Sequence, residues 1–434
     1  MIDKGGNKKV LLVTYYWPPA GGPGVQRWLK FVSYLPQFGI EPIVYIPEDP
    51  AYPIIDENLL DEVPKEVTVI KQPIREPASF ARKLFGKKTK QLQSGILPSK
   101  KASLVTRFML YIRANYFIPD ARVGWVKPSV SYLKEYCKQH HINTLITTGP
   151  PHSLHLIGLH LQKEIGLTWL ADFRDPWTTI HYFSQLPLRK RAIKKHEELE
   201  RKVLTAADSI TVTSKPTKNE FQKLTDKPIH VVTNGYDAQQ LPKKYIPLDT
   251  KFSIAHIGSL LSDRNPRTLW NALSDLLMAY PGLKEDLQIT LAGVVSEEVL
   301  KSIADAGLEA YVYNLGYVSH TKAIRLQHAS QILLLLEMDK EETKVILPGK
   351  LFEYMAAKRP VLALGPEGGA ISSVLRETKA GDYFTYQESN GIYNYLEQQY
   401  KLYKTEGIQV QSHGVAAYSR EEISKKMAAI LLNL

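Results

Sequence analysis

The fold of this chain is decided by the run Phe252-Ser253-Ile254-Ala255-His256-Ile257-Gly258, where an apolar strand ends at a glycine and a βα pattern begins for the second time. The first series begins at the strand Val10–Thr14, and the second ends at the strand Pro360–Leu364. Between these limits, short strands that are apolar on both faces alternate with segments of helical period, which is typical of parallel sheets covered by helices. Two series in tandem predict an α/β protein with two Rossmann-like, doubly wound domains that face each other across a cleft.

Domain boundaries follow from the places where this pattern is interrupted. The polar stretch 237–250 predicts a linker between an N-terminal domain, 1–236, and a C-terminal domain, 251–414. The remaining segment, 415–434, is predicted to be a helix, because Ser419 is followed three residues later by a glutamate, as in a capping box. We expect this last helix to return to the N-terminal domain.

Composition places the chain among globular proteins. Of its residues, 44% are hydrophobic and 23% are charged, as in ordinary globular domains. Its length of 434 residues is more than a single hydrophobic core usually contains, which favours two domains. No run of about 18 apolar residues occurs, so no membrane span is expected. The single cysteine, Cys137, excludes an intramolecular disulfide and argues against a cysteine zinc site. We therefore expect the protein in the cytoplasm.

The net charge of +11 indicates an anionic partner, and part of the excess is concentrated in the segment 75–113. Ten basic residues and one acid occur there, interleaved with apolar residues. This mixture is compatible with peripheral contact with an anionic membrane, here the inner face of the plasma membrane, or with a solvated basic excursion over the first domain. No nucleic-acid partner is expected, because no known nucleic-acid-binding module is present.

A glycine loop follows the first strand and contains Gly21, Gly22 and Gly24. Glycines at that place let a backbone approach a phosphate at the beginning of a helix, although a merely structural loop is the alternative. A dinucleotide site is disfavoured, because Arg27 occupies the position of the third glycine of the G-x-G-x-x-G fingerprint.

Polar residues also follow two later strands of the first domain. His152 comes after the strand Thr144–Thr148, at the edge where doubly wound sheets bind ligands, and is a candidate catalytic imidazole. The next strand is followed by Asp172, Arg174 and Asp175, which could act as acid–base groups or acceptor contacts, or could form an arginine–aspartate network that shapes the loop.

The second domain repeats this arrangement with two basic residues. Gly258 is followed by Arg264 in a loop that leads to a helix, and a cation there is suited to a diphosphate, unless it is only a solvated loop residue. Gly349 begins another helix, so its free amides and Lys350 can face phosphate oxygens. Glu353 lies on the same helical face and can accept two hydrogen bonds from a ribose diol; the alternative is an exposed Lys–Glu pair.

The stretch from Leu347 through Pro348 to Glu353 resembles the donor-site helix of glycosyltransferase family four, in its bacterial surface-polysaccharide type, which has the GT-B architecture. The family motif has two glutamates separated by seven residues; Glu353 matches the second, and Val345 stands where the first would fall. The resemblance implies that the C-terminal domain binds a nucleotide sugar and that the N-terminal domain binds the acceptor.

The resemblance also implies roles for other residues. Ser259 replaces the arginine of the family's Gly-Arg-Leu stretch, and Arg264 takes the place of its lysine. Tyr317 and Val318 match the strand end that contacts the nucleobase through backbone groups, the glycine loop lies near donor and acceptor, and His152 matches a histidine near the transferred sugar.

The expected activity is that of a retaining glycosyltransferase, which moves a sugar from a nucleoside-diphosphate sugar of UDP or GDP type to a hydroxyl of a lipid-linked or polysaccharide acceptor. No metal and no cofactor are expected. Catalysis would depend on His152, Arg264 and Lys350. Two alternatives stay open: a nucleotide-sugar 2-epimerase, whose acid–base groups would be Asp172 and Asp175, and a non-catalytic GT-B scaffold, favoured by the missing first glutamate.

Overall fold

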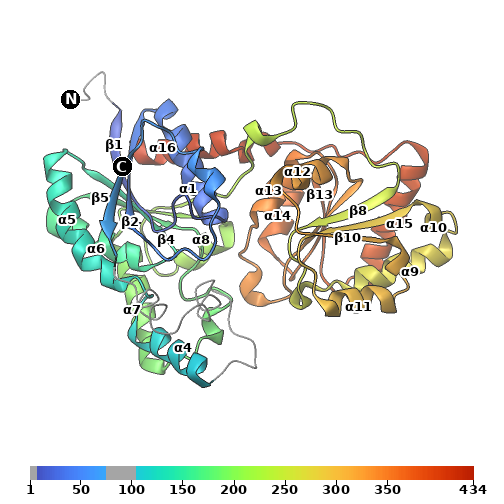
Figure 1. The fold of residues 1–434 in the computed structure, drawn as a ribbon, viewed down its shortest axis with the longest axis horizontal. Helices are drawn as coiled ribbons and strands as arrows, with labels where there is room; N and C mark the ends of the chain where they lie inside the picture. The colour runs from blue at the N-terminus through green and yellow to red at the C-terminus, as the bar shows by residue number, and fades with distance from the viewer. Residues whose placement is uncertain (1–6, 75–103) are drawn as a thin grey trace. The chain divides into compact units, whose positions relative to one another are not determined.

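The structure is a computed structural model and describes residues 7–74 and 104–434. It divides into two compact units. The first extends to Thr233 and also contains Ile423–Leu434, and the second is Asn234–Glu422. Figure 1 shows one twisted sheet with surrounding helices in each unit.

The first unit is built on a seven-stranded sheet with the order β3-β2-β1-β4-β5-β6-β7, in which every neighbouring pair is parallel. The strands are β1 (Lys8–Val13), β2 (Ile40–Glu48), β3 (Thr68–Pro73), β4 (Thr144–Gly149), β5 (Thr168–Phe173), β6 (Ser209–Val212) and β7 (Ile229–Val231). The helices are α1 (Pro23–Tyr34), α4 (Leu104–Tyr116), α5 (Val126–Gln139), α6 (Ser153–Ile165), α7 (Lys190–Ala206), α8 (Lys215–Phe221) and α16 (Arg420–Leu432).

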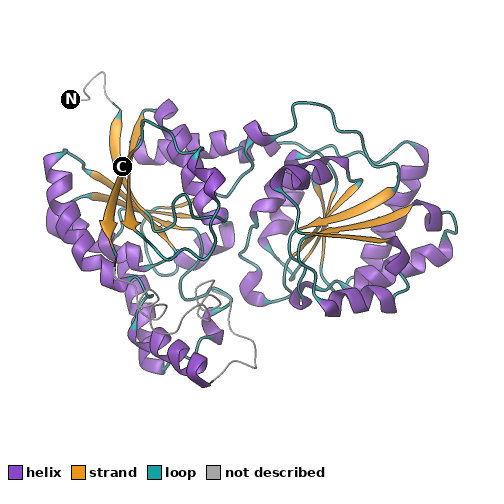
Figure 2. Ribbon diagram, in the orientation of Figure 1, coloured by secondary structure: helices purple, strands orange, loops and turns teal. Residues whose placement is uncertain are grey.

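Alternation along β1 explains why this sheet is covered on both faces. Leu11 and Val13 pack into one buried cluster with residues of α5, α6 and α7, whereas Val10 and Leu12 pack into another with α1 and α16. Figure 2 shows helices on both sides of each sheet. Each fully buried aliphatic side chain of these layers stabilises the fold by about 1.5–3 kcal/mol relative to an exposed one.

The second unit has a six-stranded parallel sheet with the order β10-β9-β8-β11-β12-β13. The strands are β8 (Phe252–Ile257), β9 (Leu287–Ala292), β10 (Val312–Gly316), β11 (Ile332–Leu336), β12 (Val361–Leu364) and β13 (Gly381–Phe384). The helices are α9 (Arg267–Ala279), α10 (Leu283–Asp286), α11 (Glu297–Asp305), α12 (His320–Ala329), α13 (Gly349–Ala356), α14 (Ala370–Thr378) and α15 (Ser389–Thr405).

Two elements of the second unit do not stand out in the sequence. Strand β13 contains Gly381 and Asp382, which are rare in strands, and lies at the edge of the sheet, where an apolar run is not needed. Helix α15 begins after Glu388 without a side-chain cap. The last helix matches expectation, because the Glu422 amide donates to the Ser419 hydroxyl over 3.3 Å and the helix packs in the core of the first unit.

The predicted fold class, two doubly wound parallel α/β domains with the last helix in the first of them, is confirmed. In each sheet the strand order reverses once, between β1 and β4 and between β8 and β11. Loops leaving the carboxyl ends of these strand pairs diverge, and ligands of doubly wound sheets bind in the opening that results. The fold therefore directs attention to the residues that follow these four strands.

Candidate functional site

In the second unit, Gly258 follows β8 with a backbone φ of 133°, a value that favours glycine. A Cβ atom at this position would lie 3.1 Å from the Nζ atom of Lys350. The glycine thus lets a lysine from another element approach the end of β8.

Lys350 is the second residue of α13, and its ammonium group lies close to the end of β8. Its side chain is half-buried, and within the described part of the chain it forms neither a hydrogen bond nor an ion pair. Burial, followed by the charge of Arg264, lowers the pKa of Lys350 to about 8. No side chain caps the amino end of α13 at Pro348, so free amides and the positive end of the helix dipole lie beside the ammonium group.

Arg264 completes the basic group, and a carboxylate from β11 orients it. Its Nη2 atom lies 3.2 Å from Oε1 of Glu337, whose side chain is 3% exposed, against 29% for Arg264. The same Oε1 atom accepts a hydrogen bond from the Met338 amide over 2.9 Å. Because the arginine is partly exposed, one face of its guanidinium stays available to a ligand.

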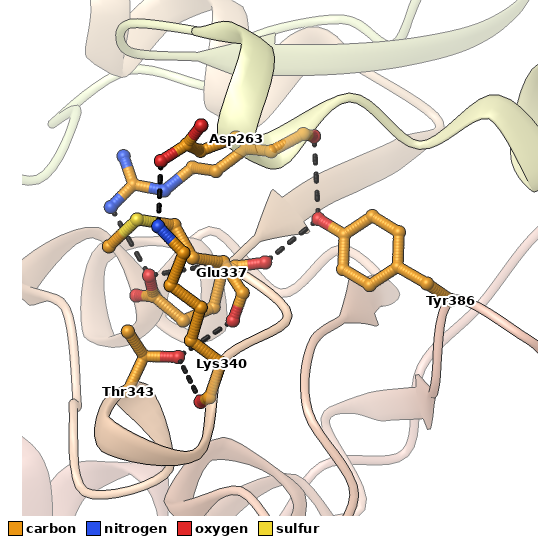
Figure 3. A network of polar contacts seen from close by, with 7 residues as sticks. Asp263, Glu337, Lys340, Thr343 and Tyr386 are labelled. Atoms are coloured by element: carbon orange, nitrogen blue, oxygen red, sulfur yellow. Dashed lines mark hydrogen bonds and ion pairs between the residues drawn. The ribbon is translucent and has the colours of Figure 1, made fainter. Parts of the chain in front are cut away.

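A tyrosine from beyond β13 connects the two loops of this network. The Tyr386 hydroxyl lies 2.8 Å from the carbonyl oxygen of Glu337 and 3.3 Å from that of Arg264. Figure 3 shows Glu337, Tyr386 and the neighbouring pair Asp263–Lys340. No local sequence pattern marks Tyr386, whereas Glu337 has a signal in the sequence, because it is an acid directly after the apolar strand Ile332–Leu336.

An open cavity of about 660 Å³ lies at the carboxyl ends of β11, β12 and β13, and it is large enough for a monosaccharide. Its charged side chains are mostly paired with each other or with neighbours. Lys340 contacts Asp263 at 2.8 Å, and Lys344 contacts Glu341 at 2.6 Å. The cavity therefore offers polar groups of both signs.

Glu353 lies one turn after Lys350 on α13, and one of its oxygens is already occupied. Its Oε2 atom accepts a hydrogen bond from the Gln327 side chain over 2.9 Å, and the carboxylate is half-buried. The adjoining cavity, which His320 and Tyr236 also line, measures only about 20 Å³ and has room for little more than one water. A ribose diol would have to approach the other oxygen.

The remaining donor-site candidates are dispersed around this group. Ser259 is exposed beside Gly258, and Leu347 is buried just before α13. Tyr317, 91% exposed, and Val318 follow β10 at the sheet edge, two strands from β8. Half-buried Val345 supplies no carboxylate where the family has one. The predicted nucleobase contact stays a prediction.

In the first unit, the glycine loop leads into α1. Gly22 has a φ of 107° and is the N-cap residue of α1, without a side-chain cap. Gly24 lies in the first turn, and a Cβ atom there would overlap the Arg174 guanidinium. Gly21 packs against Ile54, whose Cγ2 atom would lie 3.0 Å from a Cβ atom at this position. The loop thus brings the beginning of a helix and a cation together.

His152 lies at the beginning of α6 and is buried, which the sequence pattern did not predict. Its ring stacks on Trp177 with centroids 4.8 Å apart and planes 3° apart, and it is only 8% exposed. Neither ring nitrogen has a hydrogen-bond partner in the described part of the chain. Burial, followed by the charges of His155 and Arg174, lowers the pKa of His152 well below its ordinary value, so the imidazole is neutral.

Trp177, which the sequence analysis did not select, positions this imidazole. Its Nε1 atom donates a hydrogen bond to Nδ1 of His196 over 3.0 Å. The next residue, Thr178, donates to Glu200 on the same helix, α7, through both its amide and its hydroxyl. The indole is therefore held by α7, while both buried nitrogens of His152 have no hydrogen-bond partner in the described chain.

The carboxylate of Asp172 forms its ion pair with an arginine of α1, outside the segment 171–177. Asp172 is fully buried, and Arg27 of α1 contacts it at 3.0 Å, whereas Arg174 forms no ion pair within residues 7–74 and 104–434. Three further donors reach the carboxylate over 2.8 Å each, namely Trp28, Thr148 and Thr211. Arg27 occupies the position of the third glycine in the G-x-G-x-x-G fingerprint, and its side chain is 1% exposed, so it reaches Asp172 inside the core.

This result bears on the acid–base alternative. Asp172 accepts four hydrogen bonds and no surface of it is open, so it cannot exchange protons with a substrate. Asp175 is exposed and has no hydrogen bond or ion pair in the described part of the chain.

Two further findings concern cofactors and membranes. Among the described residues, no group of three or more His, Cys, Asp or Glu side chains is arranged to hold a metal ion. None of the helices in residues 7–74 and 104–434 has the length and apolar content needed to cross a bilayer.

Comparison with known proteins identifies solved structures of the same fold. No family model matches the chain, and no curated protein matches it by sequence. HepE from Anabaena, solved with UDP and glucose, is 16% identical with a TM-score of 0.58, over 99% of this chain and 100% of that one. WaaG, a glycosyltransferase involved in lipopolysaccharide biosynthesis, is 13% identical with a TM-score of 0.54, over 97% of this chain and 99% of that one. A UDP-N-acetylglucosamine 2-epimerase is 13% identical with a TM-score of 0.53, over 98% of this chain and 96% of that one.

At such identities the likeness concerns the fold alone. The chain has the GT-B fold class that the sequence predicted, with two Rossmann-like domains of seven and six strands. Both transferases and an epimerase use this fold, so the activity has to be argued from the site.

Proposed function

We propose that the protein is a retaining glycosyltransferase that moves a sugar from a nucleoside-diphosphate sugar to a hydroxyl group of a lipid-linked or polysaccharide acceptor. The observation that carries this proposal is the Lys350 ammonium, which forms no ion pair in the described chain and lies at the end of β8, beside Gly258 and the uncapped amino end of α13. A half-buried cation without a carboxylate calls for an anionic ligand.

A diphosphate is the anion that fits this arrangement. Arg264 supplies a second cation, and the α13 amides supply further donors at the point where the strand order of the sheet reverses. The cavity of about 660 Å³ offers room for the sugar. A fold likeness to HepE, which was solved with UDP and glucose, supports a UDP sugar as the donor.

The chemistry follows from where charge develops. The bond between the anomeric carbon and the phosphate oxygen breaks, and the leaving diphosphate gains negative charge that Lys350 and Arg264 stabilise. The acceptor hydroxyl attacks from the face that the diphosphate leaves and transfers its proton to a diphosphate oxygen, so the configuration is retained. His152, which is neutral and has no hydrogen-bond partner in the described chain, polarises the region around the transferred sugar, and Glu353 binds the ribose.

We extend the proposal to the membrane. Residues 75–103 of the basic segment 75–113 lie outside the described residues. The rest of the segment belongs to α4, which carries an exposed Arg107 and a Phe108 that is 62% exposed. A cation beside an exposed aromatic ring suits an anionic bilayer surface. Flotation with liposomes that contain or lack anionic lipid tests this, and equal binding to both would contradict it.

The central test is the donor site itself. Lys350→Ala and Glu353→Ala should each reduce transfer, the first by on the order of 10²-fold or more. Wild-type transfer in both variants would show that the donor is placed wrongly. Product analysis separates the alternatives: a free nucleoside diphosphate with a glycosylated acceptor supports a transferase, an epimerised nucleotide sugar supports an epimerase, and binding without turnover across a broad acceptor panel supports a scaffold.

A further inference from the structure

Arg174 follows β5 in the first unit, and its guanidinium rests on the beginning of α1. A Cβ atom added at Gly24 would overlap its Nη1 atom, so no side chain separates the charge from the helix backbone. One nitrogen donates to the carbonyl oxygen of Pro150, and the Tyr16 ring centroid lies 6.0 Å from the guanidinium carbon. Within the described residues Arg174 forms no ion pair, although the carboxylates of Asp175 and Asp172 act on its charge, and its Nε atom has no acceptor.

The beginning of α1 makes this position more electropositive. The helix has twelve residues, Gly22 at its N-cap provides no side-chain acceptor, and its first turn contains no acid. The amino end of a helix carries a partial positive charge and normally attracts a carboxylate or another anion. Here it meets a guanidinium instead, and the fully buried carboxylate of Asp172 already binds Arg27.

His152 adds an independent indication of a ligand at the same place. The Arg174 amide donates to the Gly149 carbonyl oxygen over 3.0 Å, and a Cβ atom at Gly149 would lie 2.9 Å from Nδ1 of His152. The imidazole is only 8% exposed, yet neither nitrogen has a partner in the described chain. Buried polar nitrogens are normally hydrogen-bonded, so an absent partner points to a bound molecule.

We infer that Arg174, the amino end of α1 and His152 bind a phosphate or diphosphate group of the acceptor, so that the acceptor is a phosphate-linked saccharide and not a neutral glycan. A planar guanidinium and a helix amino end are both suited to phosphate oxygens. Assigning this anion to the acceptor rests on the proposed transfer, in which the donor diphosphate already has Lys350 and Arg264 in the second unit.

Inorganic pyrophosphate, titrated calorimetrically into the full chain, tests the site directly, because it presents phosphate oxygens without a sugar or a lipid. The wild type should bind two pyrophosphates. The variants Lys350→Ala and Arg174→Gln should each bind one, and the double variant should bind none. Loss of a charged hydrogen-bond partner should weaken the affected site by about ten-fold or more. Gly24→Ala should weaken the same site as Arg174→Gln, because it displaces the guanidinium and keeps the charge.

A matched control is Lys195→Gln, which removes one exposed positive charge from α7 and should change neither site. Thermal unfolding of every variant checks that the fold is intact. With transfer assays, Arg174→Gln should raise KM for a prenyl-diphosphate-linked sugar by about ten-fold and leave KM for the donor and for the same sugar as an alkyl glycoside unchanged.

The outcomes separate this inference from the proposed function. Unchanged pyrophosphate binding in both Arg174→Gln and Gly24→Ala would overturn it. A single pyrophosphate in the wild type, lost in either Lys350→Ala or Arg174→Gln, would also overturn it, because both units would then bind the donor's diphosphate. A site that depends on Arg174 alone, with none that depends on Lys350, would support the anion site and contradict the proposed donor site.

Discussion

The two units place different charges where their strand orders reverse. Each has an arginine–carboxylate pair near that place, Arg27–Asp172 in the first and Arg264–Glu337 in the second. Near the same place each also has a partly buried cation that forms no ion pair in the described chain, Arg174 and Lys350 respectively.

The difference lies in exposure. In the first unit the paired side chains are 1% and 0% exposed, and three more donors surround the carboxylate. In the second, Arg264 is 29% exposed and contacts Glu337 at the rim of the site. A fully buried pair can only support the fold, whereas a partly exposed one can also face a ligand. We therefore expect the first pair to support the fold, and under the proposed function we expect the second pair to face the ligand as well.

The largest expected effect tests the buried pair. Asp172→Ala should lower the free energy of unfolding by about 3–5 kcal/mol, because Arg27 would keep an uncompensated charge in the core. Urea unfolding followed by circular dichroism measures it. Asp226→Ala, at an exposed position between α8 and β7, serves as the control and should stay within about 0.5 kcal/mol of the wild type. Equal effects at the two positions would remove the distinction.

The second effect tests the unpaired cation. Lys350→Ala should lower kcat by about 10²–10³-fold, because one donor to the developing charge is lost, while stability changes little. Steady-state kinetics with a nucleotide sugar and unfolding curves measure the two quantities. Lys301→Ala, which removes an exposed lysine from α11, should leave both unchanged. A large stability loss with normal turnover would identify Lys350 as a structural residue.

The third effect compares the pairs directly. Glu337→Gln should reduce the free energy of unfolding by about 1–3 kcal/mol, less than Asp172→Ala, since the partly exposed Arg264 can be hydrated. The matched control is Glu298→Gln, whose partner Arg267 is exposed, and its effect should be below about 1 kcal/mol. If Glu337→Gln destabilises as much as Asp172→Ala, the second pair is structural too.

The smallest effect is the pH dependence of donor binding. The pKa of Lys350 is about 8, so its ammonium is charged below that pH and neutral above it. Donor affinity should therefore fall as pH rises through 8, by up to about ten-fold per unit. Lys350→Arg keeps its charge throughout and should remove this dependence between pH 7 and 10. A wild-type profile that is flat over the same interval would contradict the role of the ammonium.

Much of the fold was predictable because its signal is local. Val10–Thr14, Thr144–Thr148 and Phe252–His256 are apolar runs whose burial on both faces appears in the residues themselves, and the structure confirms strands there. Strand β13 was missed because an edge strand with a glycine and an aspartate lacks that run.

The candidate site was predictable only in part. Gly258 and Lys350 were both selected from local patterns, a glycine after a strand and a lysine at a helix start. Glu337, Tyr386 and Trp177 were not, because each acts through a contact with a residue remote in the sequence.

The sequence by itself determined two βα series, the glycine loops and the cations beside them, because hydrophobic period and helix-start chemistry are properties of neighbouring residues. Only the tertiary structure decided which cations keep a carboxylate. Arg27 finds Asp172 across 145 residues and Arg264 finds Glu337 across 73, whereas Arg174 and Lys350 find none in the described chain. The physical reason is that charge pairing depends on proximity in space, which parallel strand order creates and local sequence does not encode.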